Sequence, residues 1–131
     1  MSLIIVKKSR KPVGIPTILI SEKSELISFN TSFMQNPVLN GAKYVRVAYD
    51  PDERIIAFDF TSEENLKTDE HFKLGQKGMT SIKATSLLNS FNLKIKDIAG
   101  TYTGDALKGP ESIEGFSENG FVIYIDKRSN S

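Results

Sequence analysis

The sequence contains no cysteine and a single histidine, His71. Without cysteine, the chain can form neither a disulfide framework nor a thiolate metal site. A zinc site or a Ser–His–Asp arrangement would depend on that one histidine, which lies in a polar stretch typical of a protein surface. We therefore expect no enzymatic activity, no metal and no cofactor. The lack of cysteine also favours a reducing, cytoplasmic location.

Long apolar runs and an excess of one charge are also missing. The chain has 17 basic and 16 acidic residues and a net charge of +1, whereas nucleic-acid-binding domains are usually basic overall. This balance still leaves room for a local basic patch. No apolar run approaches the roughly 20 residues that span a bilayer. The apolar residues 3–6 precede the first charges, whereas a signal peptide has its charges first. We expect no membrane association and no export.

The chain does have the composition of one globular domain. Its 131 residues are 39% hydrophobic and 25% charged, which suffices for a core without metal or disulfides. A basic stretch at 7–11 is followed by prolines and a glycine, which disfavour helix. We predict a basic N-terminal arm at 1–16, a globular domain at 17–126 and a polar tail at 127–131.

Alternating apolar residues in the first half predict two hairpins. Thr17–Ser21 and Glu25–Asn30 are short strand-like runs separated by a polar loop. Tyr44–Tyr49 and Arg54–Thr61 are longer, and the acidic stretch 50–53 between them contains a proline at a favoured turn position. We interpret that acidic cluster as turn chemistry and not as a metal site.

The remaining elements are shorter and more polar. Helical spacing predicts a turn of helix at Ser32–Gln35, capped by Asn30 or Thr31, and a helix at Ser86–Phe91 capped by Thr85. We also predict a hairpin made by 72–74 and 79–84 around a β-turn at 75–78, strands at 98–103 and 120–126, and a long loop at 104–119. The fold class that follows is α+β, mostly antiparallel β, forming a small barrel or a curved sheet with two short helices.

The two halves of the chain follow the same order of elements. With an offset of 55 residues, Ile27 falls on Ile82 and Phe33 falls on Leu88, so the alternation between inner and outer faces is preserved. This pattern indicates either an internal duplication of two ββαββ units or a match that any two such segments would produce. The candidate repeats are 17–61 and 72–126.

The segment Ile27–Phe60 resembles the AbrB/MazE-like swapped-hairpin DNA-binding domain. A strand at Ile27–Asn30 enters a short helix, Val38-Leu39-Asn40-Gly41 forms a linker, and a hairpin follows at Tyr44–Phe60. Members of that family normally dimerise to complete one barrel, so the resemblance implies DNA binding and, with a tandem copy, a barrel within one chain. The arginines that the family carries around its first strand and helix are replaced here by Glu25 and by serine and asparagine residues.

A second segment, Tyr44–Phe91, is similar to the single-stranded-DNA-binding transcriptional-coactivator fold and its Whirly relatives. The shared feature is the order of four strands and a helix, with a Lys-Gly pair before the last strand. Those proteins lay single strands across a curved sheet that presents basic and aromatic side chains. In this sequence the resemblance assigns that role to Tyr44, Arg46, Lys73, Lys77 and Lys83.

Two functional hypotheses follow. The first is a nucleic-acid-binding accessory or regulatory protein, in which the arm also contacts phosphates of single- or double-stranded DNA. Its candidate residues are Lys7, Lys8, Arg10, Lys11, Tyr44, Arg46, Lys73, Lys77 and Lys83. The second is a protein-interaction or structural module of phage or mobile-element type that binds no nucleic acid. It would form a homo-oligomer or bind a protein partner through exposed strand edges, and the basic arm would then only aid solubility.

Overall fold

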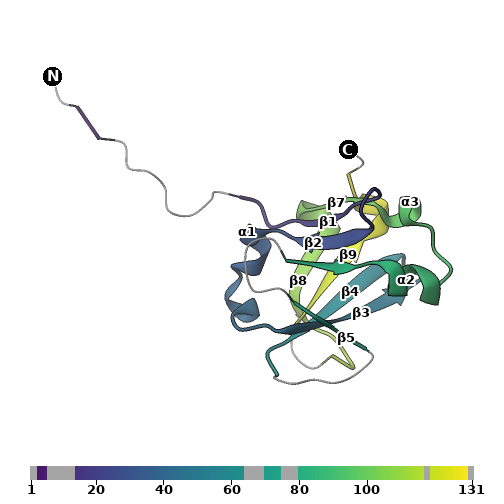
Figure 1. Cartoon of the computed structure of the whole chain (residues 1–131). Coiled ribbons are helices and arrows are strands. Elements are labelled where there is room, and N and C mark those ends of the chain that lie inside the picture. Colours follow the sequence, from purple (N-terminus) through teal and green to yellow (C-terminus); the bar gives the residue numbers. More distant parts are fainter. Residues whose placement is uncertain (1–2, 6–13, 64–69, 75–79, 117–118, 130–131) are drawn as a thin grey trace.

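Two antiparallel sheets face each other across one apolar interior (Figure 1). The structure is a computed structural model, and it describes residues 3–5, 14–63, 70–74, 80–116 and 119–129. Within these ranges it contains nine β-strands and three short α-helices. The predicted α+β class with mostly antiparallel strands is therefore confirmed.

The four-stranded sheet has the strand order β6-β2-β1-β7. Its strands are β1 (Ile18–Ile20), β2 (Leu26–Phe29), β6 (Thr80–Lys83) and β7 (Gly100–Tyr102). β1 and β2 form the first predicted hairpin, in which Ile18 lies opposite Phe29. Because successive side chains of a strand point to opposite faces, the isoleucines of β1 and β2 line the interior and Leu19 faces outward.

The five-stranded sheet has the strand order β5-β3-β4-β9-β8. Its strands are β3 (Tyr44–Asp50), β4 (Ile55–Thr61), β5 (His71–Lys73), β8 (Leu107–Ser112) and β9 (Asn119–Tyr124). β3 and β4 form the second predicted hairpin, with Val45 opposite Phe60. In its turn, the Asp50 carboxylate accepts hydrogen bonds from the backbone N–H groups of Asp52 and Glu53. This agrees with the predicted turn role of the acidic cluster.

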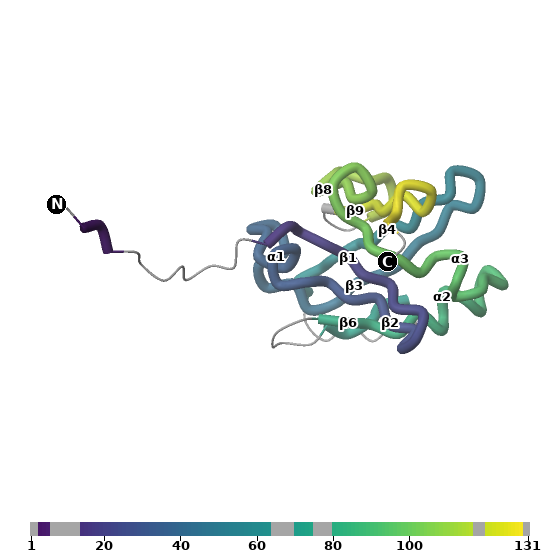
Figure 2. Tube along the Cα trace, turned by 90° about the horizontal axis from the view of Figure 1, so that it is seen from above, coloured from purple at the N-terminus to yellow at the C-terminus, as the bar shows by residue number. Residues whose placement is uncertain are grey.

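The short helices lie at the ends of the sheets. They are α1 (Thr31–Met34), α2 (Thr85–Ser90), α3 (Ile95–Ile98) and three 3₁₀ turns, η1 (Pro37–Leu39), η2 (Gly104–Ala106) and η3 (Ile125–Lys127). Asn30 caps α1 as predicted, because its Oδ1 accepts a hydrogen bond from the Phe33 N–H. β2 leads into α1, β6 leads into α2, and these two strands are antiparallel neighbours. The two helices therefore lie at opposite ends of the sheet (Figures 1 and 2).

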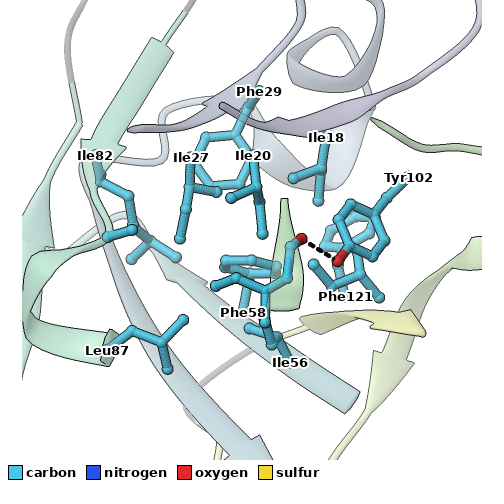
Figure 3. Close-up of a cluster of buried hydrophobic side chains, with 14 of the residues drawn as sticks. Ile18, Ile20, Ile27, Phe29, Ile56, Phe58, Ile82, Leu87, Tyr102 and Phe121 are labelled. Carbon is cyan, nitrogen blue, oxygen red and sulfur yellow. Dashed lines mark hydrogen bonds between the residues drawn. The ribbon is translucent and has the colours of Figure 1, made fainter. Parts of the chain in front are cut away.

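A cluster of phenylalanine rings joins the two sheets. The Phe29 ring of β2 lies 5.4 Å from the Phe58 ring and 5.3 Å from the Phe60 ring of β4, in edge-to-face geometry. Phe33 of α1 reaches Phe121 of β9 at 4.8 Å. Figure 3 shows Phe29, Phe58 and Phe121 of this cluster together with the surrounding isoleucines in the interior. Edge-to-face pairs of this kind add about 0.5–1.5 kcal/mol each beyond the area that they bury.

The predicted barrel is wrong for the part of the chain that the structure describes. The four-stranded sheet ends at β6 and β7, the five-stranded sheet ends at β5 and β8, and no pairing between described strands closes either one. Alternating apolar residues indicate which face of a strand is buried, but they do not indicate whether the outer strands of a sheet meet.

Three local predictions are also corrected. The segments 72–74 and 79–84 do not form a hairpin, because β5 pairs with β3 and β6 pairs with β2 in the other sheet. The predicted strand at 98–103 is shortened by α3, which adds a third helix. Thr85 is the first residue of α2 and not its cap.

The stretch 104–119 is not a continuous loop, because it contains β8. This strand pairs with β9 across an irregularity between Lys108 and Glu111, where Gly109 and Pro110 interrupt the ladder. Proline and glycine are tolerated at such a place because β8 is an edge strand and exposes most of its side chains. The sequence therefore lacks the alternation that marks a half-buried strand.

The internal duplication of 17–61 and 72–126 stays a prediction. The strands predicted to be equivalent, β2 and β6, lie side by side with Ile27 opposite Ile82. The other equivalent pair, β1 and β5, lies in different sheets. Among the described helices, none has the length and apolar character needed to cross a bilayer.

Tyr102 is the one tyrosine of the described chain that is completely buried. It is 0% exposed, and its hydroxyl donates a hydrogen bond to the Ile98 carbonyl at the end of α3 (Figure 3). Burial raises the pKa of the phenol to about 12, because the interior disfavours the charged phenolate.

Stability should therefore fall at alkaline pH. The unfolded chain releases the phenol proton near pH 10 and the folded chain retains it up to about pH 12, so between these values the unfolded state binds fewer protons and the free energy of unfolding decreases. We expect this group to contribute a loss on the order of 2–3 kcal/mol.

The measurement is urea unfolding of wild type and Tyr102→Phe across this range. The variant should be less stable at neutral pH by about 1 kcal/mol, because the Ile98 carbonyl loses its donor, and should lose less stability as the pH rises. Equal slopes for the two proteins would show that the phenol ionises freely in the folded state.

Candidate functional site

The edge of β3 is the structural feature that defines the candidate site. β5 pairs with β3 only at Tyr44, Val45 and Arg46, whereas β3 continues to Asp50. Among the residues that the structure describes, no strand lies beside Val47–Asp50 on that side. Because alternate residues of an antiparallel strand direct their backbone groups to the same side, two of these four residues present donors and acceptors to that side, where no described strand pairs with them.

A groove of about 400 Å³ runs along this open edge. On the inner side of the sheet it is bordered by Leu87 of α2 and by Phe91, whose ring packs edge-to-face against Tyr49 at 4.9 Å. On the outer side it is bordered by residues 114–116, including Phe116. Phe91 is 45% exposed, so a large aromatic surface faces solvent within the groove.

Arg46 holds the outer wall of the groove in place. Its Nη2 lies 2.9 Å from Oδ2 of Asp59 on β4 and donates to the Gly115 carbonyl at 2.6 Å. The guanidinium carbon also lies 5.7 Å from the centre of the Phe116 ring, a distance at which a cation is attracted by the aromatic face. One side chain thus connects β3, β4 and the 114–116 segment, which is far away in the sequence.

The rim of the groove is acidic. The Asp59 carboxylate is completely buried and balances the charge of Arg46. Glu70 and Glu114 also line the groove, both are exposed, and the Glu70 carboxylate lies 4.0 Å from the Arg46 guanidinium. Glu70 and Glu114 therefore add two negative charges near Arg46, whose positive charge is already balanced by Asp59. The groove therefore favours a ligand that carries positive charge beside apolar groups.

The structure brings together some of the residues predicted to bind nucleic acid. Tyr44 and Lys73 are cross-strand partners on the outer face of the five-stranded sheet. Arg46 shares this face, where it is engaged with Asp59. Lys83 lies on β6 of the other sheet and points away from the interior. It is therefore on the opposite side of the molecule from Tyr44.

The remaining predicted residues lie outside the described part of the chain. They are Lys7, Lys8, Arg10, Lys11 and Lys77. Among the described residues, no group of three or more acidic or histidine side chains is arranged to hold a metal ion.

Sequence reasoning missed most of the groove. Phe116 and Glu114 fall in a stretch predicted as loop, and Phe91 was predicted as the apolar face of a helix. The one available signal was the length of the strand at 44–49 compared with the short run at 72–74, which leaves part of the longer strand without a neighbour.

We expect the Arg46–Asp59 pair to be essential for stability. Arg46→Met leaves the buried carboxylate without its guanidinium partner and should lower the free energy of unfolding by about 3 kcal/mol, the lower end for buried pairs because Arg46 is partly exposed. The double variant Arg46→Met/Asp59→Asn should lose less, because no charge is left buried.

The matched control is Arg54→Met, which breaks an exposed arginine–aspartate pair with Asp126 and should leave stability unchanged within error. Urea denaturation of the four proteins provides the comparison. An Arg46→Met variant as stable as wild type would contradict the role assigned to Arg46.

Comparison of the chain with protein-family models, with curated proteins and with solved structures gave no significant match. The resemblances to the AbrB/MazE-like and Whirly-like domains therefore remain predictions.

Proposed function

We propose that this protein is an interaction module that binds an extended segment of a protein along the open edge of β3. The observation that supports this most directly is that β3 continues past β5 at Val47–Asp50, and that Val47 and Ala48 of this stretch line the groove together with Leu87 and Phe91. An extended peptide placed there continues the five-stranded sheet beyond β5, and its backbone groups pair with those of β3. Such strand addition is a recurrent mode of peptide recognition.

The groove also sets the side chains that the ligand should carry. Alternate residues of an added strand point to opposite faces of the sheet. Those on the inner face would contact Leu87 and Phe91, and those on the outer face would lie near Phe116 and Glu114. The best ligand therefore has β-branched or other large apolar residues and at least one lysine or arginine.

A selection from phage-displayed random peptides of about 12 residues tests this proposal. We expect the wild-type protein to select peptides of that composition, and the amide signals of Val47–Asp50 to shift in NMR spectra when a selected peptide is added. Ala48 is exposed and lines the groove, so Ala48→Arg should obstruct the edge and repel a basic ligand, weakening binding at least about tenfold.

Ser81→Arg is the matched control, because Ser81 is also a small, exposed residue on an edge strand, β6, but lies outside the groove. It should bind the selected peptides as the wild type does. Failure of the monomeric protein to select any peptide, or equal binding by Ala48→Arg, would reject the groove as a peptide site.

The pairing of Tyr44 with Lys73 favours nucleic-acid binding as a second candidate function. An aromatic ring beside a lysine on a sheet surface is suited to stacking a base next to a phosphate contact, and stacking contributes about 1–3 kcal/mol per base. We expect salt-dependent mobility shifts of short DNA that Tyr44→Ala and Lys73→Ala weaken. Lys83→Ala, on the opposite side, serves as control. No shift at low salt with single- or double-stranded DNA would exclude this function.

A further inference from the structure

We infer that the segment bound in the groove is Leu3–Ile5 of the N-terminal arm of a second copy of this chain. This inference rests on the proposed function of the groove and names its partner. Leu3–Ile5 and the groove both expose apolar surface in the described part of the chain, and their chemistry is complementary.

The arm presents apolar surface at Leu3–Ile5 that the described part of its own chain leaves largely exposed. Leu3, Ile4 and Ile5 are 85%, 90% and 86% exposed. Burying a side chain of this size stabilises a protein by about 1.5–3 kcal/mol, so three successive exposed residues are costly. Two of the three are β-branched, as is Val6 after them in the sequence, and such residues favour extended, strand-like backbone.

The charges of the two features are opposite. Lys7 and Lys8 directly follow the apolar residues in the sequence. When Leu3–Ile5 pairs with the edge of β3, these lysines come close to the rim that carries Glu70 and Glu114. The arm thus supplies in one short segment both groups that the groove requires, large aliphatic side chains and positive charge.

The position of the arm favours a second copy over the same chain. The arm joins the domain where the Asn30 side chain binds the Thr17 N–H at 3.0 Å and the Ile15 carbonyl at 2.9 Å, at the start of α1. The groove lies beside α2, and the two helices are at opposite ends of the molecule (Figures 1 and 2). The arm therefore starts at the end far from its own groove.

A reciprocal exchange of arms buries the apolar residues of both arms at the same time. If each copy places its arm in the groove of the other, both grooves are filled and the assembly closes as a two-fold dimer. The eight residues 6–13 that separate Ile5 from Gly14 can span up to about 30 Å when extended, which is long enough to cross to a neighbouring molecule.

The experiment is sedimentation velocity and light scattering on the full chain and on two variants. Wild type should be a dimer. Ile4→Asp/Ile5→Asp, altered in the arm only, and Ala48→Arg, altered in the groove only, should each raise the dimer dissociation constant at least about tenfold. Ser81→Arg should remain dimeric. Circular dichroism and thermal unfolding verify that each variant is folded.

A mixture of the two variants provides the decisive measurement. The groove variant still has an intact arm and the arm variant still has an intact groove, so an equal mixture should form a heterodimer at a concentration at which each variant alone is monomeric. A dimer that survives both substitutions, or a mixture that stays monomeric, would overturn the arm exchange.

The result also separates this inference from the proposed function. A monomeric wild type whose groove still selects peptides in an Ala48-dependent way would overturn the arm as occupant and leave the peptide site in place. A monomeric wild type that selects no peptide would overturn both.

Discussion

Each of the two sheets buries one face, and the two buried faces meet at the ring of Phe29, which contacts aromatic rings of α1 and of the opposite sheet. Neither sheet could remain in water alone with its apolar face exposed, so this contact determines the rest of the architecture. It decides which residues of β3 face inward, and therefore that Arg46 and Ala48 face outward. The groove exists because β3 has seven residues whereas β5, the described strand beside its open edge, has three.

The Arg46–Asp59 pair connects the arrangement of the strands to the groove at the surface. The Asp59 carboxylate on the outer face of β4 is completely buried, which is tolerable only because a guanidinium lies beside it. The same guanidinium positions Phe116 along the groove. The side chain predicted as a phosphate contact is thus a structural element of an acidic, apolar groove. This is the main reason why we favour a peptide over a nucleic acid as ligand at this site.

The presence of this groove changes the interpretation of the basic arm. Considered by its charge alone, the stretch at 7–11 suits either phosphate binding or solubility. Considered together with the exposed residues Leu3–Ile5, it becomes the second half of an amphipathic segment. A protein of nearly balanced charge gains little from long-range attraction, whereas apolar burial combined with two short-range charge contacts can provide a specific interface.

The sequence by itself determined the elements whose contacts are local. The hairpins β1–β2 and β3–β4 and the inward faces of these strands follow from alternation and turn residues within a few positions. Capping chemistry likewise limits the cap of α1 to Asn30 or Thr31, and the structure shows Asn30. Only the tertiary structure decided that β5 and β6 separate into two sheets, that β8 is a strand, that Lys83 and Tyr44 face opposite sides, and that Arg46 binds a carbonyl 69 residues away. The physical reason is that alternation encodes which face of a strand avoids water, but not which strand, of the several with the same pattern, it pairs with.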